Sequence, residues 1–169
     1  MNLVEDLIQR WTNVRKGLIG EVNQIPEDKF SFRGTPETRT IEEMIKHIVT
    51  FERVQVREQC RENANLGRRP FPEHIAEHAP HVATTQGKEA LVNLLNNSLD
   101  ESMQVVRQFG EEGLKQDTRH FDGSALSKFS FFSFVMSHEM YHRGQIALCE
   151  RMLGIEPQLT RNSNKLTRK

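Results

Sequence analysis

Cysteine is scarce in this chain of 169 residues, which contains only Cys60 and Cys149, far apart in the sequence. Two distant thiols cannot form the disulfide framework that stabilises many small secreted proteins. The N-terminal residues also lack the basic and apolar regions of a signal peptide. We therefore expect a cytoplasmic protein with reduced thiols.

The chain has no net charge, because 23 Lys and Arg residues balance 23 Asp and Glu residues. Nucleic-acid-binding proteins normally carry a basic excess or a basic face, so we expect no nucleic-acid partner. No apolar run approaches the about 20 residues of a membrane span, so we expect no membrane partner either. The one basic cluster lies at the C-terminus, where residues 161–169 are predicted to form a solvated tail.

No stretch shows sustained alternation of β-branched residues, so we expect no strands. Four segments instead repeat apolar residues at spacings of three and four, which is typical of amphipathic helices. The second begins at a capping-box pattern, Thr40 to Glu43, and Gly154 is placed to end the fourth. The segments cover about residues 3–22, 40–54, 88–109 and, starting at either Ser127 or Ser130, the residues up to 153. An all-α four-helix bundle over residues 1–160 is therefore predicted.

The connection between the second and third helices is expected to set the topology. Residues 61–86 contain Pro70, Pro72 and Pro80 and few core-type residues, so they are predicted to form a long loop. A helix of about 20 residues spans about 30 Å, and this loop is long enough to run back along it. The second and third helices can then be parallel, in an up-down-down-up bundle with a crossover.

His138 and His142 lie one helical turn apart in the fourth segment, within an otherwise apolar stripe. Buried imidazoles need polar partners, and a divalent metal is one such partner. His47 is the best third ligand, because it lies at the flank of the apolar stripe of the second helix. The alternative for each histidine is a core side chain satisfied by hydrogen bonds. The stripe consists of Phe131, Phe134, Val135, His138, His142, Gln145, Cys149 and Met152.

The same residues match the His-Glu-x-x-His pattern of zinc metalloproteases, with Glu139 as the general base. This hypothesis is disfavoured, because no histidine follows His142 and only Glu150 or Glu156 could complete the ligand set. Such proteases also bind substrate along a strand edge, which the chain is not expected to have. Glu139 and Arg143 are expected to point away from the stripe and to form ion pairs.

Several other polar residues near the predicted stripes have more than one interpretation. Gln145 could bind a ligand or orient a histidine, or be an amide at the rim of the core. Tyr141 could offer its phenol to a substrate or simply pack. Glu52 lies among apolar positions, and could pair with an arginine, face a dimer interface or orient a ligand. Cys149 is expected to be a small core residue. A surface loop is expected to hold His74, His78 and His81.

The segments Ile41-Glu-Glu-Met-Ile-Lys-His47 and His138-Glu-Met-Tyr-His142-Arg-Gly-Gln145 together resemble the DinB-like superfamily of metal-binding four-helix proteins. The resemblance covers nearly the whole chain in helix order. It implies a crossover four-helix bundle, often homodimeric, in which His47, His138 and His142 hold a divalent metal. Zn, Ni, Fe and Mn all accept three imidazoles, so the metal's identity stays open.

Relatives in this superfamily include transferases and isomerases that use bacillithiol or mycothiol. The resemblance therefore implies a metal-dependent enzyme, such as a thiol S-transferase or a hydrolase, that acts on a small molecule. A low-molecular-weight thiol is the candidate small-molecule partner. In the alternative, the bundle is not an enzyme and its metal is structural or sensory.

Overall fold

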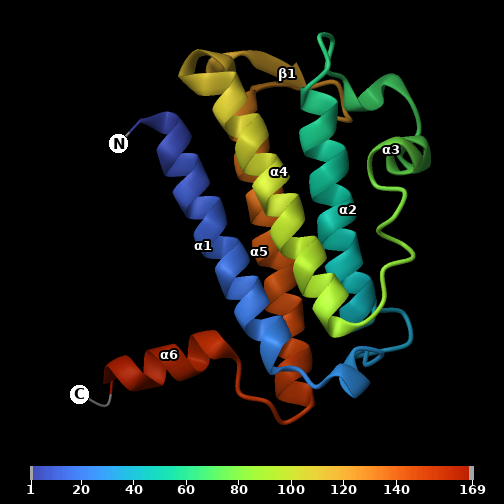
Figure 1. Cartoon of the computed structure of the whole chain (residues 1–169), viewed down its shortest axis with the longest axis vertical. Helices are drawn as coiled ribbons and strands as arrows, with labels where there is room; N and C mark the ends of the chain where they lie inside the picture. Colours follow the sequence, from blue (N-terminus) through green and yellow to red (C-terminus); the bar gives the residue numbers. More distant parts are fainter. Residues whose placement is uncertain (1, 168–169) are drawn as a thin grey trace.

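Four long helices packed side by side form the body of the protein (Figure 1). The structure is a computed structural model that describes residues 2–167, with side chains as far as Ser163. The helices α1 and α5 run in one direction, and α2 and α4 run in the other (Figure 1). This arrangement confirms the predicted four-helix bundle with parallel second and third long helices. They are α1 (Leu3–Gln24), α2 (Ile41–Gln59), α4 (Lys88–Lys115) and α5 (Lys128–Met152).

The helices that carry the histidines begin where the sequence provides caps. The Thr40 side chain accepts a hydrogen bond from the Glu43 amide, and the Glu43 carboxylate accepts one from the Thr40 amide. These two bonds satisfy amides that would otherwise lack partners at the start of α2. Ser127 caps α5 in a similar way, and Gly154 follows α5 with a φ of 77°. The predicted starts of α2 and α5 and the glycine stop are confirmed.

Apolar residues of the four helices form two core clusters, one toward each end of the bundle. Trp11 is fully buried in one of them and contacts Phe132 of α5. Charged residues occupy core positions between these clusters, as described below. The first cluster includes Leu18, Val22, Ile41, Ile45, Leu91 and Ile146, and the second includes Leu7, Val54, Leu99, Val106, Phe131 and Val135.

The crossover segment is more ordered than predicted. It contains a short 3-10 helix, η2 (Leu66–Arg68), and an α-helix, α3 (Phe71–His78), which packs beside α2 (Figure 1). The prediction of a loop without helices is therefore wrong here. Pro70 and Pro72 do not prevent α3, because they lie at its start, where a missing N–H costs little. His74 is buried and His78 is half-buried, so only His81 lies on the surface as expected.

The prediction of no strands is wrong in one place. A hairpin joins α4 to α5, with β1 (Asp117–Arg119) antiparallel to β2 (Ala125–Ser127). Its strands have three residues each, too few for an alternating pattern to stand out in the sequence. Gly123, with a φ of 82°, lies in the turn between them. Another short 3-10 helix, η1 (Glu27–Lys29), follows α1.

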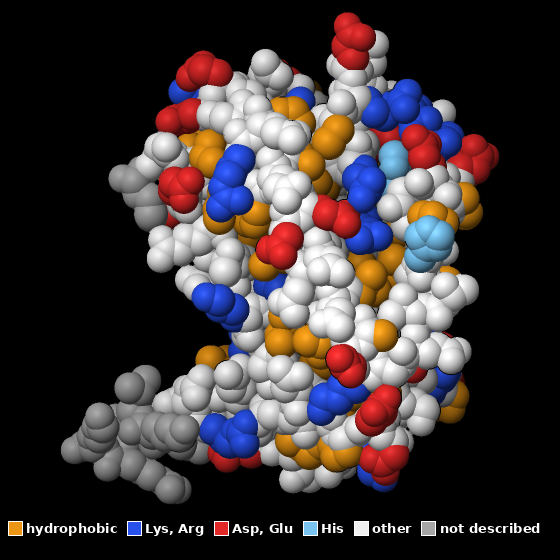
Figure 2. Space-filling model, viewed as in Figure 1, with side chains coloured by type: hydrophobic (Ala, Val, Ile, Leu, Met, Phe, Trp, Pro, Cys, Tyr) orange, Lys and Arg blue, Asp and Glu red, His pale blue; other side chains and the backbone are white. Residues whose placement is uncertain are grey.

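The chain ends in a helix, α6 (Gln158–Thr167), that packs against α1. Residues 161–167 of the predicted solvated tail therefore belong to a helix, while Arg168 and Lys169 lie outside the described residues. Figure 2 shows acidic and basic side chains mixed over one face of the bundle, as expected for a chain without net charge. Within residues 2–167, no helix combines the length and hydropathy needed to span a membrane.

Candidate metal centre

The buried face of α5 is rotated from the predicted stripe. Glu139 is only 2 % exposed, whereas Phe134 is 41 % and Met152 is 53 % exposed. His142 lies within the buried face, and His138 lies at its edge. The apolar pattern predicted the wrong buried face of α5, because a charged residue such as Glu139 was expected to be exposed. Its carboxylate is instead paired with a cation inside the bundle.

The partner of that carboxylate is Arg15 of α1, which is itself fully buried. The Arg15 Nε donates to Glu139 Oε1 at 2.7 Å, and its second terminal nitrogen donates to Glu139 Oε2 at 2.9 Å. Trp11 Nε1 also donates to Glu139 Oε2, at 3.2 Å. The predicted ion pair of Glu139 is confirmed, but it lies in the core. Arg143 also forms its expected ion pair, with Glu21 at 2.7 Å.

Glu52 of α2 belongs to the same buried cluster. Its carboxylate accepts hydrogen bonds from Arg15 at 2.5 Å, from Ser98 at 2.9 Å and from Ser102 at 2.7 Å. Of the three interpretations of Glu52, the structure therefore supports pairing with an arginine. Although burial alone would lower the pKa of Arg15, the two carboxylates raise it above its usual value. Burial also raises the pKa of Glu139, against the effect of Arg15.

The three predicted histidines meet between α2 and α5. His138 Nε2 lies 3.1 Å from His47 Nε2 and 3.1 Å from His142 Nε2. The three ligand atoms lie within 4.8 Å of one another. In a tetrahedral or octahedral site with metal–nitrogen bonds of about 2.0–2.1 Å, neighbouring ligand nitrogens are about 2.9–3.4 Å apart. The observed spacing therefore suits a shared metal ion.

The hydrogen-bonding capacity of the imidazoles also fits a metal. His142 Nδ1 lies 2.6 Å from Gln145 Oε1, which can only accept, so the proton of neutral His142 lies on Nδ1 and its Nε2 is a free acceptor. One proton on His138 Nε2 cannot satisfy both of its neighbours. A cation at the centre of the three nitrogens would satisfy all of them.

The electrostatic surroundings keep these rings neutral, as metal ligands must be. Burial lowers the pKa of His47 to about 4 and that of His138 to about 3. Burial likewise lowers the pKa of His142, although the bond to Gln145 acts in the opposite direction. The positive charge of Arg39 contributes to the lower pKa of all three histidines.

Neighbouring side chains fix the orientation of the rings. Gln145 holds His142 through its Nδ1, the arrangement that commonly orients a metal-binding histidine. Phe51, one turn beyond His47 on α2, stacks on His138 with ring centroids 3.8 Å apart. Tyr141 touches the His142 ring but is 64 % exposed. Phe51 was expected in the apolar stripe of α2 beside His47, but its stacking on His138 was not predicted.

The other expected members of the site lie elsewhere. Cys149 is buried in the core, as predicted. Glu150, considered as a protease ligand, is fully buried and lies 3.4 Å from Gln24. Both oxygens of Glu139 are bonded to Arg15, so this carboxylate is not available as the general base of a protease.

A second group with metal-ligand spacing consists of Glu58, His74 and His78. Here Arg68 already binds both oxygens of Glu58, at 2.7 Å and 2.9 Å. His74 Nε2 contacts the Leu66 carbonyl oxygen at 3.1 Å. Because an arginine neutralises its carboxylate, we interpret this group as an ion-pair cluster that attaches α3 to α2.

Comparison with known proteins agrees with the four-helix bundle fold. The model of the DinB family matches residues 1–167. The chain belongs to the DinB family. A DinB-like protein from Bacillus subtilis has the same fold, with a TM-score of 0.66 and 18% identity over 88% of this chain and 92% of that one. Among curated proteins, none matches the sequence.

Two further solved structures with a similar fold have described activities. YfiT from Bacillus subtilis, a probable metal-dependent hydrolase with an unusual four-helix bundle topology, gives a TM-score of 0.67 at 14% identity, over 90% of this chain and 89% of that one. A mycothiol-dependent maleylpyruvate isomerase gives a TM-score of 0.65 at 13% identity. This chain is covered over 86% of its length in that match, but it spans only 63% of the isomerase.

Proposed function

We propose that this protein binds a divalent metal through His47, His138 and His142, and that it is a metal-dependent transferase or hydrolase. The observation that carries the proposal is the convergence of three imidazole Nε2 atoms, two pairs of which are 3.1 Å apart. The lowered pKa values of the three rings support the same proposal, because neutral imidazoles are the form that binds metals.

A divalent metal lowers the pKa of a water or thiol bound to it and so makes a nucleophile available near neutral pH. The residues of this chain would hold the metal and exclude competing ligands. Three neutral imidazoles add no negative charge to the centre and leave coordination positions for another ligand. Gln145 and Phe51 would keep His142 and His138 in the binding orientation.

The substrate would enter from the surface around the start of α2. A hollow of about 840 Å³ is lined by His47, Thr50 and the loop that precedes α2, and a second of about 560 Å³ is lined by Gln145, Leu148 and Cys149. Both have the size of a small-molecule site. We propose a small-molecule substrate, with a low-molecular-weight thiol as the second reactant in a reducing cytoplasm.

The metal content of purified protein tests the proposal. We expect about one divalent metal per chain for the wild type purified without added metal, and a loss of metal from the variant H138A/H142A. Because the variant could fail to fold, its helicity is measured alongside, with H81A on the surface as a matched control. A folded wild type without a stoichiometric metal contradicts the proposal.

A structural metal is the second candidate, because the histidines join α2 to α5 and a bound ion would tie the two helices together. In that case, removing the metal lowers the melting temperature, and no thiol-transfer or hydrolytic turnover appears across a broad substrate screen. Turnover that depends on the metal would exclude this alternative.

We also propose a homodimer through the exposed face of α5. Four apolar side chains there, spaced by seven, seven and four residues, form one stripe along the helix. Apolar stripes of this kind become buried when two copies meet about a twofold axis. The stripe consists of Phe134, Tyr141, Leu148 and Met152, which are between 41 % and 64 % exposed.

A further inference from the structure

One arginine near the metal centre lacks a protein partner. Arg39 is exposed and immediately precedes Thr40, the N-cap of α2. Among the described residues, its guanidinium forms no ion pair and no hydrogen bond. A guanidinium has five N–H donors, and those of Arg39 are therefore available to a ligand.

Arg39 lies between the two hollows beside the metal centre. It lines the hollow that includes His47 and also the hollow that includes Gln145. A ligand that occupies either hollow therefore lies beside Arg39.

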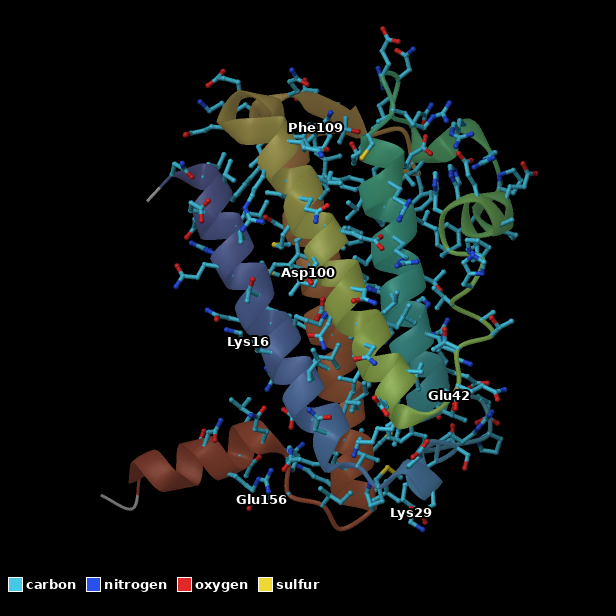
Figure 3. All side chains as sticks on the ribbon, in the orientation of Figure 1. Lys16, Lys29, Glu42, Asp100, Phe109 and Glu156 are labelled. Carbon is cyan, nitrogen blue, oxygen red and sulfur yellow. The ribbon has the colours of Figure 1, made fainter. Side chains whose placement is uncertain are left out.

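The neighbouring cations differ from Arg39, because they already have partners. Arg33 is paired with Glu43 at 3.5 Å, and Lys46 is paired with Glu42 at 2.7 Å. Glu42 is labelled in Figure 3, near the start of α2 and at the same end of the bundle as Lys29. The loop between them carries Arg39. Arg39 is therefore the cation of this region that forms neither an ion pair nor a hydrogen bond within the described structure, although its charge also acts on Glu43.

The backbone that carries Arg39 is well fixed. The capping box holds Thr40 and Glu43 together, and the Ile41 amide donates to the Phe32 carbonyl oxygen at 3.0 Å. Thr38 is held by the Thr35 carbonyl oxygen at 2.9 Å. A guanidinium on a fixed backbone loses less conformational freedom when it binds a ligand than one on a mobile loop.

We propose that the substrate carries a carboxylate and that Arg39 binds it while the reacting part of the molecule lies at the metal centre. The proposal rests on the metal centre proposed above and names the class of its substrate. The planar guanidinium can donate two parallel hydrogen bonds to a carboxylate. Glu37 lines both hollows, and its negative charge opposes a doubly charged phosphate group more strongly than the single charge of a carboxylate group.

Binding of simple carboxylates to the Co²⁺-loaded protein tests the proposal. The visible absorption of Co²⁺ reports when a carboxylate reaches the metal, and no turnover is needed. The probes are three pairs of acids that differ by one carboxylate: acetate and malonate, propionate and succinate, butyrate and glutarate. A diacid long enough to span from the metal to Arg39 would use both of its carboxylates.

In the wild type, we expect at least one diacid to bind about 5–10-fold more tightly than its monoacid, beyond the about twofold statistical gain from having two carboxylates. The variant R39Q should reduce that ratio to the statistical value. The matched control R33Q should keep it, because Arg33 is already paired with Glu43. A ratio that R39Q leaves unchanged, or no preference for any diacid, overturns the proposal.

The experiment distinguishes a failure of the proposed metal centre from a failure of the carboxylate proposal. If the protein binds no stoichiometric Co²⁺, the metal centre itself is wrong and the carboxylate proposal is overturned with it. If Co²⁺ binds and monoacids alter its spectrum as strongly as diacids do, the metal centre stands and only the role of Arg39 is overturned.

Discussion

Replacing Arg15 by methionine would remove the cation that two buried carboxylates share. Arg15 is fully buried, and Glu52 and Glu139 are 1 % and 2 % exposed. The guanidinium makes hydrogen bonds to both carboxylates, to Ser98 and to the Leu95 carbonyl oxygen. In R15M the carboxylates would face each other without a counter-ion, which is costly in a site that water does not reach.

Breaking a buried ion pair by removing one partner typically costs about 3–5 kcal/mol. For a protein of this size, that loss lowers the melting temperature by about 6–20 °C. Denaturant titration of R15M at pH 7.5 measures the loss directly. The matched control is R10M, because Arg10 lies on the same helix and its side chain is 64 % exposed in a pair with Asp6. We expect that control to lose about 0.5 kcal/mol or less.

The stability that R15M loses relative to the wild type should depend on pH. Without Arg15, the guanidinium no longer opposes the burial that already raises the folded-state pKa of Glu139 above the unfolded value of about 4.3. A raised carboxyl pKa makes the folded state bind protons more tightly, so stability is present at low pH and is lost as pH rises. R15M should therefore lose less stability, relative to wild type, at pH 5 than at pH 7.5.

Neutralising the carboxylates should restore part of the stability. The triple variant R15M/E52Q/E139Q keeps the shapes of the side chains but has no buried charge, and we expect it to regain about 2 kcal/mol over R15M at pH 7.5. A loss below about 1 kcal/mol in R15M, or an equal loss at both pH values, would refute the reasoning that Arg15 neutralises buried carboxylates.

Two other changes follow from the same structure. Burial and the nearby Glu21 raise the pKa of Glu150 to about 7, so wild-type stability should fall as pH rises from about 4.5 to 7. E150Q should remove this fall and be about 1–2 kcal/mol more stable than wild type at pH 8, since one pKa unit is worth about 1.4 kcal/mol; equal stability at pH 8 would contradict it. L148E should turn a homodimer into a monomer in light scattering, whereas K16E on α1 should not; a wild-type monomer would remove the dimer proposal.

The helices and their topology were predictable from the sequence because they depend on features that repeat along it. Apolar residues at helical spacing located the four long helices, and Thr40, Ser127 and Gly154 marked their ends. The length of the crossover segment indicated parallel second and third helices. The three-residue strands and the eight-residue α3 are too short to give such a repeat.

The histidine cluster was predictable, but its surroundings were not. His138 and His142 share a helix face by spacing alone, and His47 follows from the need for a third ligand. By contrast, nothing in the sequence separates Arg39 from Arg33. The difference between them is a contact with Glu43, which arises only when the loop and α2 are placed together.

The charged core was missed for a different reason. Apolar periodicity placed Val14 in the buried stripe of α1, but Arg15 is the buried residue there. An arginine becomes a core residue only when acids on other helices meet it. Those acids, Glu52 and Glu139, are distant in the sequence, so their meeting could not be read from any one helix. Arg15 lies between Trp11 and Leu18 at helical spacing, and that position was the available signal.

The two sides of α5 contact different helices. This explains why the His-Glu-x-x-His pattern does not indicate a protease here. Arg15 and Trp11 hold Glu139 on the side facing α1, whereas His138 and His142 face His47 on α2. Glu139 therefore has a structural role between two proposed metal ligands. We expect E139Q to lower the free energy of unfolding while it keeps a stoichiometric metal. A variant that keeps full stability but loses all turnover would instead support Glu139 as a general base.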